Sequence, residues 1–197
     1  MEDKAKQFWT SQKEYPKYGT IKQRRLHELN YLVPKLKDVK SLLDLGCGDG
    51  ALIKCLHHLT DIEKYYAFDI ATNMMDNIPA ICEHYDCCEP RELPETDATV
   101  FSGVIPFLFD DNQVHEVLKR IKSPLIYIKS PCSMDKPTKV DTFSEKLQAN
   151  YASYYRTILQ MIEIISQHFN INDVLRAYPD EIESEFGTKQ IIFLCSK

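Results

Sequence analysis

The feature that most constrains the fold is a glycine-rich turn within "SLLDLGCGDGALIKCL", residues 41–56. The apolar run over residues 39–45 predicts a strand buried on both faces, and the apolar residues after the turn recur at helical spacing. A strand, a turn without side chains and a helix begin a crossover unit in a parallel sheet. Main-chain N–H groups at the helix N-terminus can then contact a ligand, because side chains are absent at Gly46, Gly48 and Gly50.

The rest of the chain repeats this alternation of strand and helix. Further apolar runs predict strands over residues 64–70, 81–86, 97–104, 125–130, 173–178 and 189–196. The last two runs are separated by turn residues rather than by a helix, which predicts an antiparallel hairpin. We therefore expect an α/β fold: a doubly wound, mostly parallel seven-stranded sheet with a C-terminal antiparallel hairpin and helices on both faces.

Helical spacing marks three further segments besides the one after the glycine turn. One helix is expected over residues 21–36 with a break near Pro34, and another around residues 114–121, after an N-terminal cap in residues 110–112. A long helix is expected from Tyr155 to Ile165. The segment between residues 131 and 150 has no clear periodicity and is expected to be irregular.

Composition limits the classes of function. A chain of 197 residues with 44% hydrophobic and 27% charged residues suits one globular domain. A net charge of −5 provides no general attraction to nucleic acid. No apolar run approaches the roughly 20 residues that span a bilayer, and the polar N-terminus does not resemble a signal peptide. Seven cysteines without framework spacing favour a reducing, cytoplasmic location.

An acidic residue at the next strand end narrows the choice of ligand. Asp69 lies nineteen residues after Gly50, where a parallel sheet places its carboxylate within reach of both hydroxyls of a ribose. The pattern G-x-G-x-x-A also permits a nicotinamide dinucleotide. Against it, Asp44 lies two residues before Gly46, where it would face an amine rather than a pyrophosphate. The chain is also too short for a separate substrate domain. A nucleoside-containing cofactor is therefore expected.

The stretch "LLDLGCGDG" resembles the first motif of the class I S-adenosylmethionine-dependent methyltransferases. The resemblance implies the cofactor S-adenosyl-L-methionine, with the methionine end at the glycine loop, the ribose at Asp69 and the adenine near Ile70. "HYDCCE" and "FSGVIPFLFDD" resemble later motifs of the family. The cofactor-binding residues implied are Asp44, Gly46, Cys47, Gly48, Gly50, Asp69, Ile70, Asp86, Cys87 and Ser102. It also implies an N-terminal helical cap over the cofactor site (residues 1–38) on a Rossmann-like catalytic domain (residues 39–197), within one structural domain.

Methyl transfer depends mainly on alignment, and a base is needed only where the acceptor carries a proton. Candidate catalytic residues are Tyr15, Tyr18, Tyr155, Arg156 and His115. Arginines near tyrosines, including Arg24 or Arg25, suit an anionic or sugar-like small molecule, although the same residues equally suit simple packing. His115 is also explained by a surface helix.

No metal site is expected, because Cys82, His84, Cys87 and Cys88 lack the spacing of structural zinc sites. The leading hypothesis is therefore methylation of an O or N atom of a small metabolite. The alternatives are a protein or RNA methyltransferase, a non-catalytic cofactor-binding partner subunit and, least favoured, an NAD(P)-dependent oxidoreductase. The sequence does not define the oligomeric state.

Overall fold

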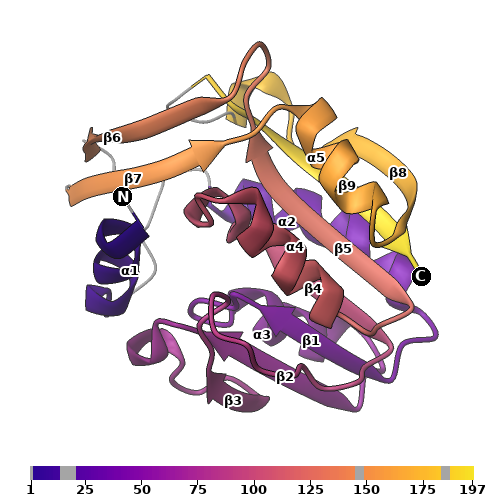
Figure 1. The fold of residues 1–197 in the computed structure, drawn as a ribbon. Coiled ribbons are helices and arrows are strands. Elements are labelled where there is room, and N and C mark those ends of the chain that lie inside the picture. Colours follow the sequence, from indigo (N-terminus) through magenta and orange to yellow (C-terminus); the bar gives the residue numbers. More distant parts are fainter. Residues whose placement is uncertain (1, 14–20, 145–148, 183–186) are drawn as a thin grey trace.

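The computed structural model describes residues 2–13, 21–144, 149–182 and 187–197, and these ranges build one main sheet with helices on both sides (Figure 1). The sheet has the strand order β3-β2-β1-β4-β5-β9-β8. Its strands are β1 (Ser41–Leu45), β2 (Lys64–Asp69), β3 (Ile81–His84), β4 (Ala98–Ser102), β5 (Leu125–Cys132), β8 (Asn170–Arg176) and β9 (Lys189–Ser196).

The directions of the strands confirm the expected fold class. The strands β3, β2, β1, β4 and β5 pair in parallel, while β9 is antiparallel to both β5 and β8. The order reverses between β1 and β4, and parallel sheets bind ligands at such a switch point, beyond the carboxyl ends of their strands.

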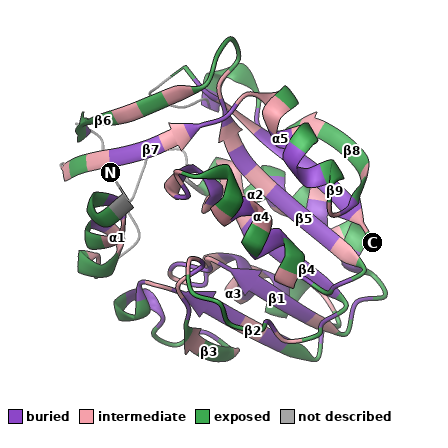
Figure 2. Cartoon of the chain, in the orientation of Figure 1, coloured by how far each residue is buried: buried purple, intermediate pink, exposed green. Residues whose placement is uncertain are grey.

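Two apolar cores cover the two faces of the sheet (Figure 2). On one face lie α2 (Ile21–Leu32), the 3-10 turn η1 (Val33–Leu36) and α3 (Ala51–Leu59); on the other lie α4 (Asp111–Arg120) and α5 (Ile158–Ser166). The strand residues alternate between the cores: Leu42 belongs to the first and Leu43 to the second. The expected break near Pro34 is confirmed, because α2 passes there into η1.

Capping residues determine where α4 and α5 begin. Asp110 accepts a hydrogen bond from the N–H of Asn112 and forms a capping box with Gln113, which confirms the cap expected at this position. Thr157 forms a second capping box with Gln160 and starts α5 at Ile158. The expected helix is therefore confirmed from Ile158, but its expected start at Tyr155 was wrong, since Tyr155 still belongs to a strand.

The expectation of an irregular segment over residues 131–150 was also wrong. The strands β6 (Thr138–Ser144) and β7 (Ala149–Tyr155) form a separate antiparallel hairpin beside the main sheet (Figure 1). In β6 most side chains are exposed or half-buried, so the apolar alternation that reveals a strand in a sequence is weak there.

The helix α1 (Glu2–Ser11) packs against this hairpin. The ring of Phe8 meets the ring of Tyr151 edge to face at 6.2 Å, and Trp9 meets Phe107 at 5.3 Å. Lys4 forms an ion pair with Asp141 at 3.0 Å. Segments from the two halves of the chain thus meet beyond the carboxyl ends of β1 and β4.

Candidate active site

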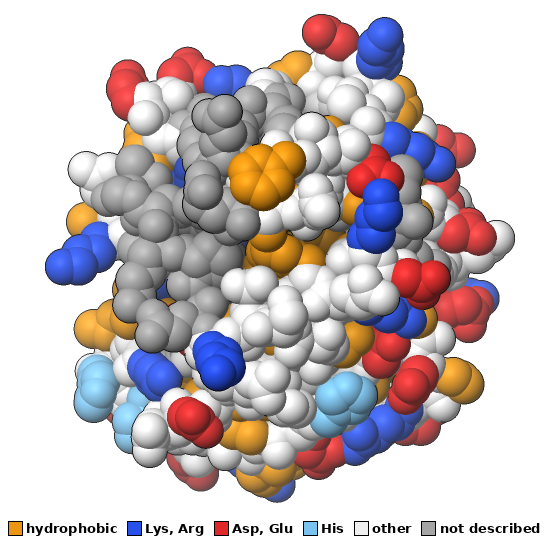
Figure 3. All heavy atoms as spheres, turned by 90° about the vertical axis from the view of Figure 1, so that its left-hand side faces the viewer, with side chains coloured by type: hydrophobic (Ala, Val, Ile, Leu, Met, Phe, Trp, Pro, Cys, Tyr) orange, Lys and Arg blue, Asp and Glu red, His pale blue; other side chains and the backbone are white. Residues whose placement is uncertain are grey.

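A cavity of about 580 Å³ lies at the carboxyl ends of β1, β2, β4 and β5. Its wall continues onto α1, α2, β7 and the segment after β8. This volume lies within the range of about 300–1,000 Å³ typical of small-molecule sites. Figure 3 shows the face that carries α1 and the hairpin, where hydrophobic side chains are exposed among charges of both signs.

The glycine loop forms one side of the cavity. Gly46, Gly48 and Gly50 all have positive φ angles (83°, 55° and 67°), which favour glycine. Gly46 and Gly48 line the cavity, as does Cys47 between them. Gly50 is not among the lining residues, and a Cβ there would lie 2.5 Å from Ile78 Cδ1. The protein's own packing therefore requires the bare α-carbon at Gly50.

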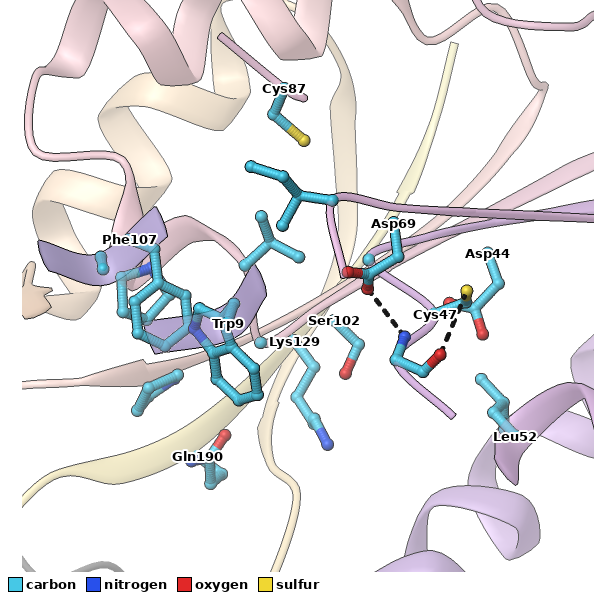
Figure 4. Close-up of a pocket in the computed structure, with 18 of the residues that line it drawn as sticks. Trp9, Asp44, Cys47, Leu52, Asp69, Cys87, Ser102, Phe107, Lys129 and Gln190 are labelled. Atoms are coloured by element: carbon cyan, nitrogen blue, oxygen red, sulfur yellow. Dashed lines mark hydrogen bonds between the residues drawn. The ribbon is translucent and has the colours of Figure 1, made fainter. Parts of the chain in front are cut away.

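Asp69 ends β2 and holds the glycine loop through hydrogen bonds (Figure 4). The Gly48 N–H donates to Asp69 Oδ2 at 2.8 Å, and the Ala71 N–H donates to Oδ1 at 2.7 Å. Burial raises the pKa of this carboxyl despite the opposing effect of these bonds. Each carboxylate oxygen has two acceptor positions, so Asp69 retains capacity for the hydroxyls of a ribose.

Asp44 places a second buried carboxyl on the cavity wall. It is only 3% exposed, and burial raises its pKa to about 7, against the opposing field of Arg25. Nearby Asp69 and Asp49 raise the pKa further. A ligand ammonium group would relieve both the lost hydration and the repulsion between these carboxyls. This part of the cavity therefore suits a cationic ligand group.

The residues expected around an adenine lie beyond Asp69. Ile70, Cys87 and Asp86 all line the cavity. Asp86 forms an ion pair with Lys6 of α1 at 2.9 Å and accepts a hydrogen bond from the Cys88 N–H. Burial alone would raise the pKa of the Asp86 carboxyl. The hydrogen bond and the positive charge of Lys6 outweigh burial and hold this pKa below its usual range.

The opposite part of the cavity contains a charged cluster that the sequence analysis did not identify. Lys129 of β5 donates hydrogen bonds to Glu28 of α2 and to Tyr178 Oη, the latter at 2.8 Å, and Tyr178 also donates to Glu28. Ser102 lines the cavity beside Lys129, since the two residues are register partners on β4 and β5. The sequence signal for this cluster was a lysine within the apolar run of a strand, because a buried lysine is normally paired.

Two tyrosines of β7 and two arginines of α2 complete this part. Tyr151 and Tyr155 line the cavity, with their hydroxyl oxygens 3.2 Å apart. Arg24 and Arg25, which the sequence suggested as partners for an anionic molecule, also line it. Arg24 donates to the Ile182 carbonyl at 2.9 Å, and Arg25 forms an ion pair with Glu28 at 3.3 Å.

Arg156 does not face the cavity. It is 1% exposed and donates to Asp111 Oδ1 at 2.7 Å and to the Leu108 carbonyl at 2.9 Å. The structure thus corrects its expected role, because its guanidinium anchors the segment between β4 and α4. His115 is also outside the cavity wall, on α4, with its Nδ1 2.8 Å from His168 Nε2. Tyr15 and Tyr18 lie outside the described residues.

Other features of the described ranges bear on cofactors and location. Within those ranges, no group of three or more histidine, cysteine or acidic residues could hold a metal ion. All seven cysteines are free thiols. Among the helices described, none has the length and apolar character needed to cross a membrane.

In sequence, the chain resembles a known protein over a short segment. No family model matches the sequence. A segment of 65 residues, 32% of this chain, is 29% identical to malonyl-[acyl-carrier protein] O-methyltransferase from Brevibacillus brevis. The match spans 23% of that protein's length.

Solved structures match over most of the chain. An S-adenosylmethionine-dependent methyltransferase from Mesorhizobium loti superimposes with a TM-score of 0.64 at 14% identity, covering 88% of this chain and 98% of that one. The 1,6-didemethyltoxoflavin-N1-methyltransferase of Burkholderia thailandensis, solved with 1,6-didemethyltoxoflavin and S-adenosylhomocysteine, gives 0.63 at 13% identity, covering 91% and 78%. The chain therefore has the fold of the class I S-adenosylmethionine-dependent methyltransferases, which confirms at this level the resemblance found in the first glycine motif.

Proposed function

We propose that this protein is an S-adenosylmethionine-dependent methyltransferase. The observation that carries the proposal is the pair of buried carboxyls, Asp44 and Asp69, on either side of a left-handed glycine loop. One suits an ammonium group and the other suits ribose hydroxyls, and S-adenosylmethionine carries both. The fold and the methyltransferases it resembles support the same cofactor.

The proposed cofactor site uses the residues inferred from the sequence, apart from Gly50. Asp44, Gly46, Cys47 and Gly48 would hold the methionine end, and Asp69 the ribose. Ile70, Asp86 and Cys87 would surround the adenine, and Ser102 would face the reactive centre. When bound, the cofactor supplies a methyl group on a positively charged sulfur. The protein then has to align the acceptor and exclude water, which can supply most of the rate.

The proposed acceptor is a small, anionic or sugar-like molecule that is methylated on an O or N atom. Arg24 and Arg25 contribute two cationic side chains to that part of the cavity, beside the carboxylate of Glu28. The hydroxyls of Tyr151 and Tyr155 add polar contacts. The net charge of −5 argues against a nucleic-acid substrate. The toxoflavin enzyme was solved with a bound small molecule, which supports a small-molecule acceptor without defining its charge.

The proposal also divides the chain into a cap and a catalytic domain and assigns a cellular location. Residues 1–38 would cap the cofactor site, because α1 reaches Asp86 through Lys6 and supplies Trp9 to the cavity wall. Residues 39–197 would form the catalytic domain. A cytoplasmic location is proposed because all seven cysteines are free thiols.

Isothermal titration calorimetry tests the cofactor. We expect heat on titration with S-adenosylmethionine and S-adenosylhomocysteine and none with NAD⁺. Asp69→Ala should weaken S-adenosylhomocysteine binding by about 10²-fold or more, since charge-assisted hydrogen bonds contribute about 1.5–3 kcal/mol each. Asp173→Ala, which changes an aspartate outside the cavity wall, is the matched control. Binding of NAD⁺ alone would refute the proposal.

Catalysis is tested separately from binding. Production of S-adenosylhomocysteine from S-adenosylmethionine is measured with a panel of phosphorylated sugars, carboxylic acids and phenols. Turnover with one of these classes supports a small-molecule enzyme. Cofactor binding without turnover, while a protein partner or RNA becomes methylated or a partner enzyme is activated, would favour the alternatives of a macromolecular methyltransferase or a non-catalytic subunit.

A further inference from the structure

A cluster on the cavity wall consists of Glu28 and Tyr178, which are buried, and Lys129, which is half-buried. The Lys129 ammonium group would be costly to bury unless it is paired, and Glu28 and Tyr178 provide that pairing. All three residues nevertheless line the cavity, so a ligand can reach the cluster. They come from α2, β5 and the segment after β8, which only the fold brings together.

The register of the sheet places this cluster near the proposed reactive centre. Lys129 pairs with Ser102 in the parallel alignment of β5 with β4, so both side chains leave the sheet at the same level. In Figure 4 these two side chains lie between Trp9 and Phe107 on one side and Asp69 on the other. The Lys129 amine is therefore a basic group on the strand that pairs with the end of β4.

We propose that Lys129 is the proton acceptor of the methyl-transfer reaction, held in place by Glu28 and Tyr178; this inference rests on the proposed function. An O–H or N–H acceptor forms its new bond to the methyl carbon with a lone pair. The pair of the broken carbon–sulfur bond stays on sulfur, which becomes a neutral thioether. The proton that the acceptor loses moves to the neutral Lys129 amine, which becomes an ammonium group.

The charge balance of the cavity favours this arrangement. While a positive sulfonium is bound, a second positive charge on Lys129 is repelled, so the neutral amine is favoured. After transfer the sulfur is neutral, and the new ammonium group is stabilised by the carboxylate of Glu28. The total charge therefore stays the same during the reaction. Burial lowers the pKa of Lys129 well below its usual range, and Arg25 and Arg24 act in the same direction.

Other titratable and charged groups also face this part of the cavity and affect a pH measurement. Arg24 and Arg25 act on Lys129 through their charge, and Glu28 and Tyr178 are bonded to it. Asp44 and Glu181 also line the cavity. Asp44 matters most, because its pKa of about 7 falls within the range that would be scanned. Deprotonation of Asp44 adds a negative charge to the cavity and would also favour binding of the sulfonium ligand over the thioether ligand. The contributions of Asp44 and Lys129 to the pH dependence therefore have to be measured separately.

The test compares two ligands that differ at the sulfur. The dissociation constants of S-adenosylmethionine and S-adenosylhomocysteine are measured by calorimetry from pH 6 to 9. As Lys129 loses its proton, affinity for S-adenosylmethionine should rise relative to S-adenosylhomocysteine by about tenfold. Asp44→Asn removes the contribution of Asp44 and should retain the part of this change that is due to Lys129. Lys129→Met should lack that part. Lys139→Met, which changes an exposed lysine of β6, should behave as wild type.

The outcomes distinguish a failure of the proposed function from a failure of the assignment of Lys129. If the wild type binds neither ligand, the proposed function fails. If both bind with a pH-independent ratio, or if Lys129→Met retains the whole pH dependence, the assignment of Lys129 is overturned. Should Lys129→Met fail to fold because Glu28 loses one of its partners, the double variant Glu28→Gln/Lys129→Met removes both members of the pair and serves the same comparison.

An acceptor found in the panel provides a second measurement. The kcat of Lys129→Met should fall by about 10²-fold or more, the usual contribution of a positioned base, with a much smaller change in KM for the acceptor. An unchanged kcat would overturn the inference.

Discussion

The contact between Gly50 and Ile78 leads to a measurable prediction about the glycine loop. At Gly50 the φ angle is 67°, and an added Cβ would lie 2.5, 2.6 and 2.8 Å from three atoms of Ile78. Favourable carbon contacts begin near 3.5 Å, so Ile78 would have to move by about 1 Å. The left-handed backbone costs an alanine about 1–2 kcal/mol, and overpacking costs about 1–3 kcal/mol. Gly50→Ala should therefore destabilise the protein by about 2–5 kcal/mol.

A double-mutant cycle separates these two costs. Ile78→Ala removes all three contacting atoms, so Gly50→Ala/Ile78→Ala should keep the backbone cost but lose the overpacking. Unfolding in urea, followed by circular dichroism at constant m-value, should then give a favourable coupling of about 1–3 kcal/mol. Purely additive effects of the two substitutions would refute the reasoning, because they would mean that a Cβ at residue 50 does not meet Ile78.

Two further predictions concern buried charges. Arg156→Ala should lower the free energy of unfolding in urea by about 3–5 kcal/mol, since it breaks a buried charged network. The affinity of the folded variant for S-adenosylhomocysteine should stay within a few-fold of wild type. A selective loss of affinity would instead show that Arg156 takes part in binding. Because the Asp44 pKa is raised to about 7, folded protein binds that proton more tightly than unfolded chain. Stability relative to Asp44→Asn should therefore fall by up to about 4 kcal/mol between pH 4 and 7, and a difference independent of pH would contradict this.

The main sheet could be predicted because its strands are buried on both faces. In β1, the residues Leu42, Leu43, Asp44 and Leu45 are all buried, which produces an apolar run that few other structures explain. The hairpin of β6 and β7 lies outside both cores, and in β6 only Ser144 is buried. Its strands are stabilised by pairing with each other and, for β7, by α1, and such contacts leave little trace in a hydrophobic pattern.

The proposed cofactor half of the cavity consists of residues that the sequence could bring together, because they are neighbours along the chain or end adjacent strands. The glycine loop follows β1 directly, and Asp69 ends the next strand. The other half combines residues separated by 101 positions (Glu28 and Lys129) and by 150 positions (Glu28 and Tyr178). No local pattern links such residues, so only tertiary structure identifies them. Arg156 shows the converse error, since a cation near tyrosines indicated a ligand where a buried anchor was present.

The bonds that fix Asp69 have a consequence for recognition. Two backbone amides already orient this carboxylate, one of them from Gly48 in the loop that a ligand would touch. The carboxylate oxygens of Asp69 are therefore already fixed in orientation before a ribose binds. The entropy lost in ordering them is lost during folding rather than during association. Loop geometry and nucleoside affinity should consequently change together in any variant, natural or engineered, that disturbs either amide.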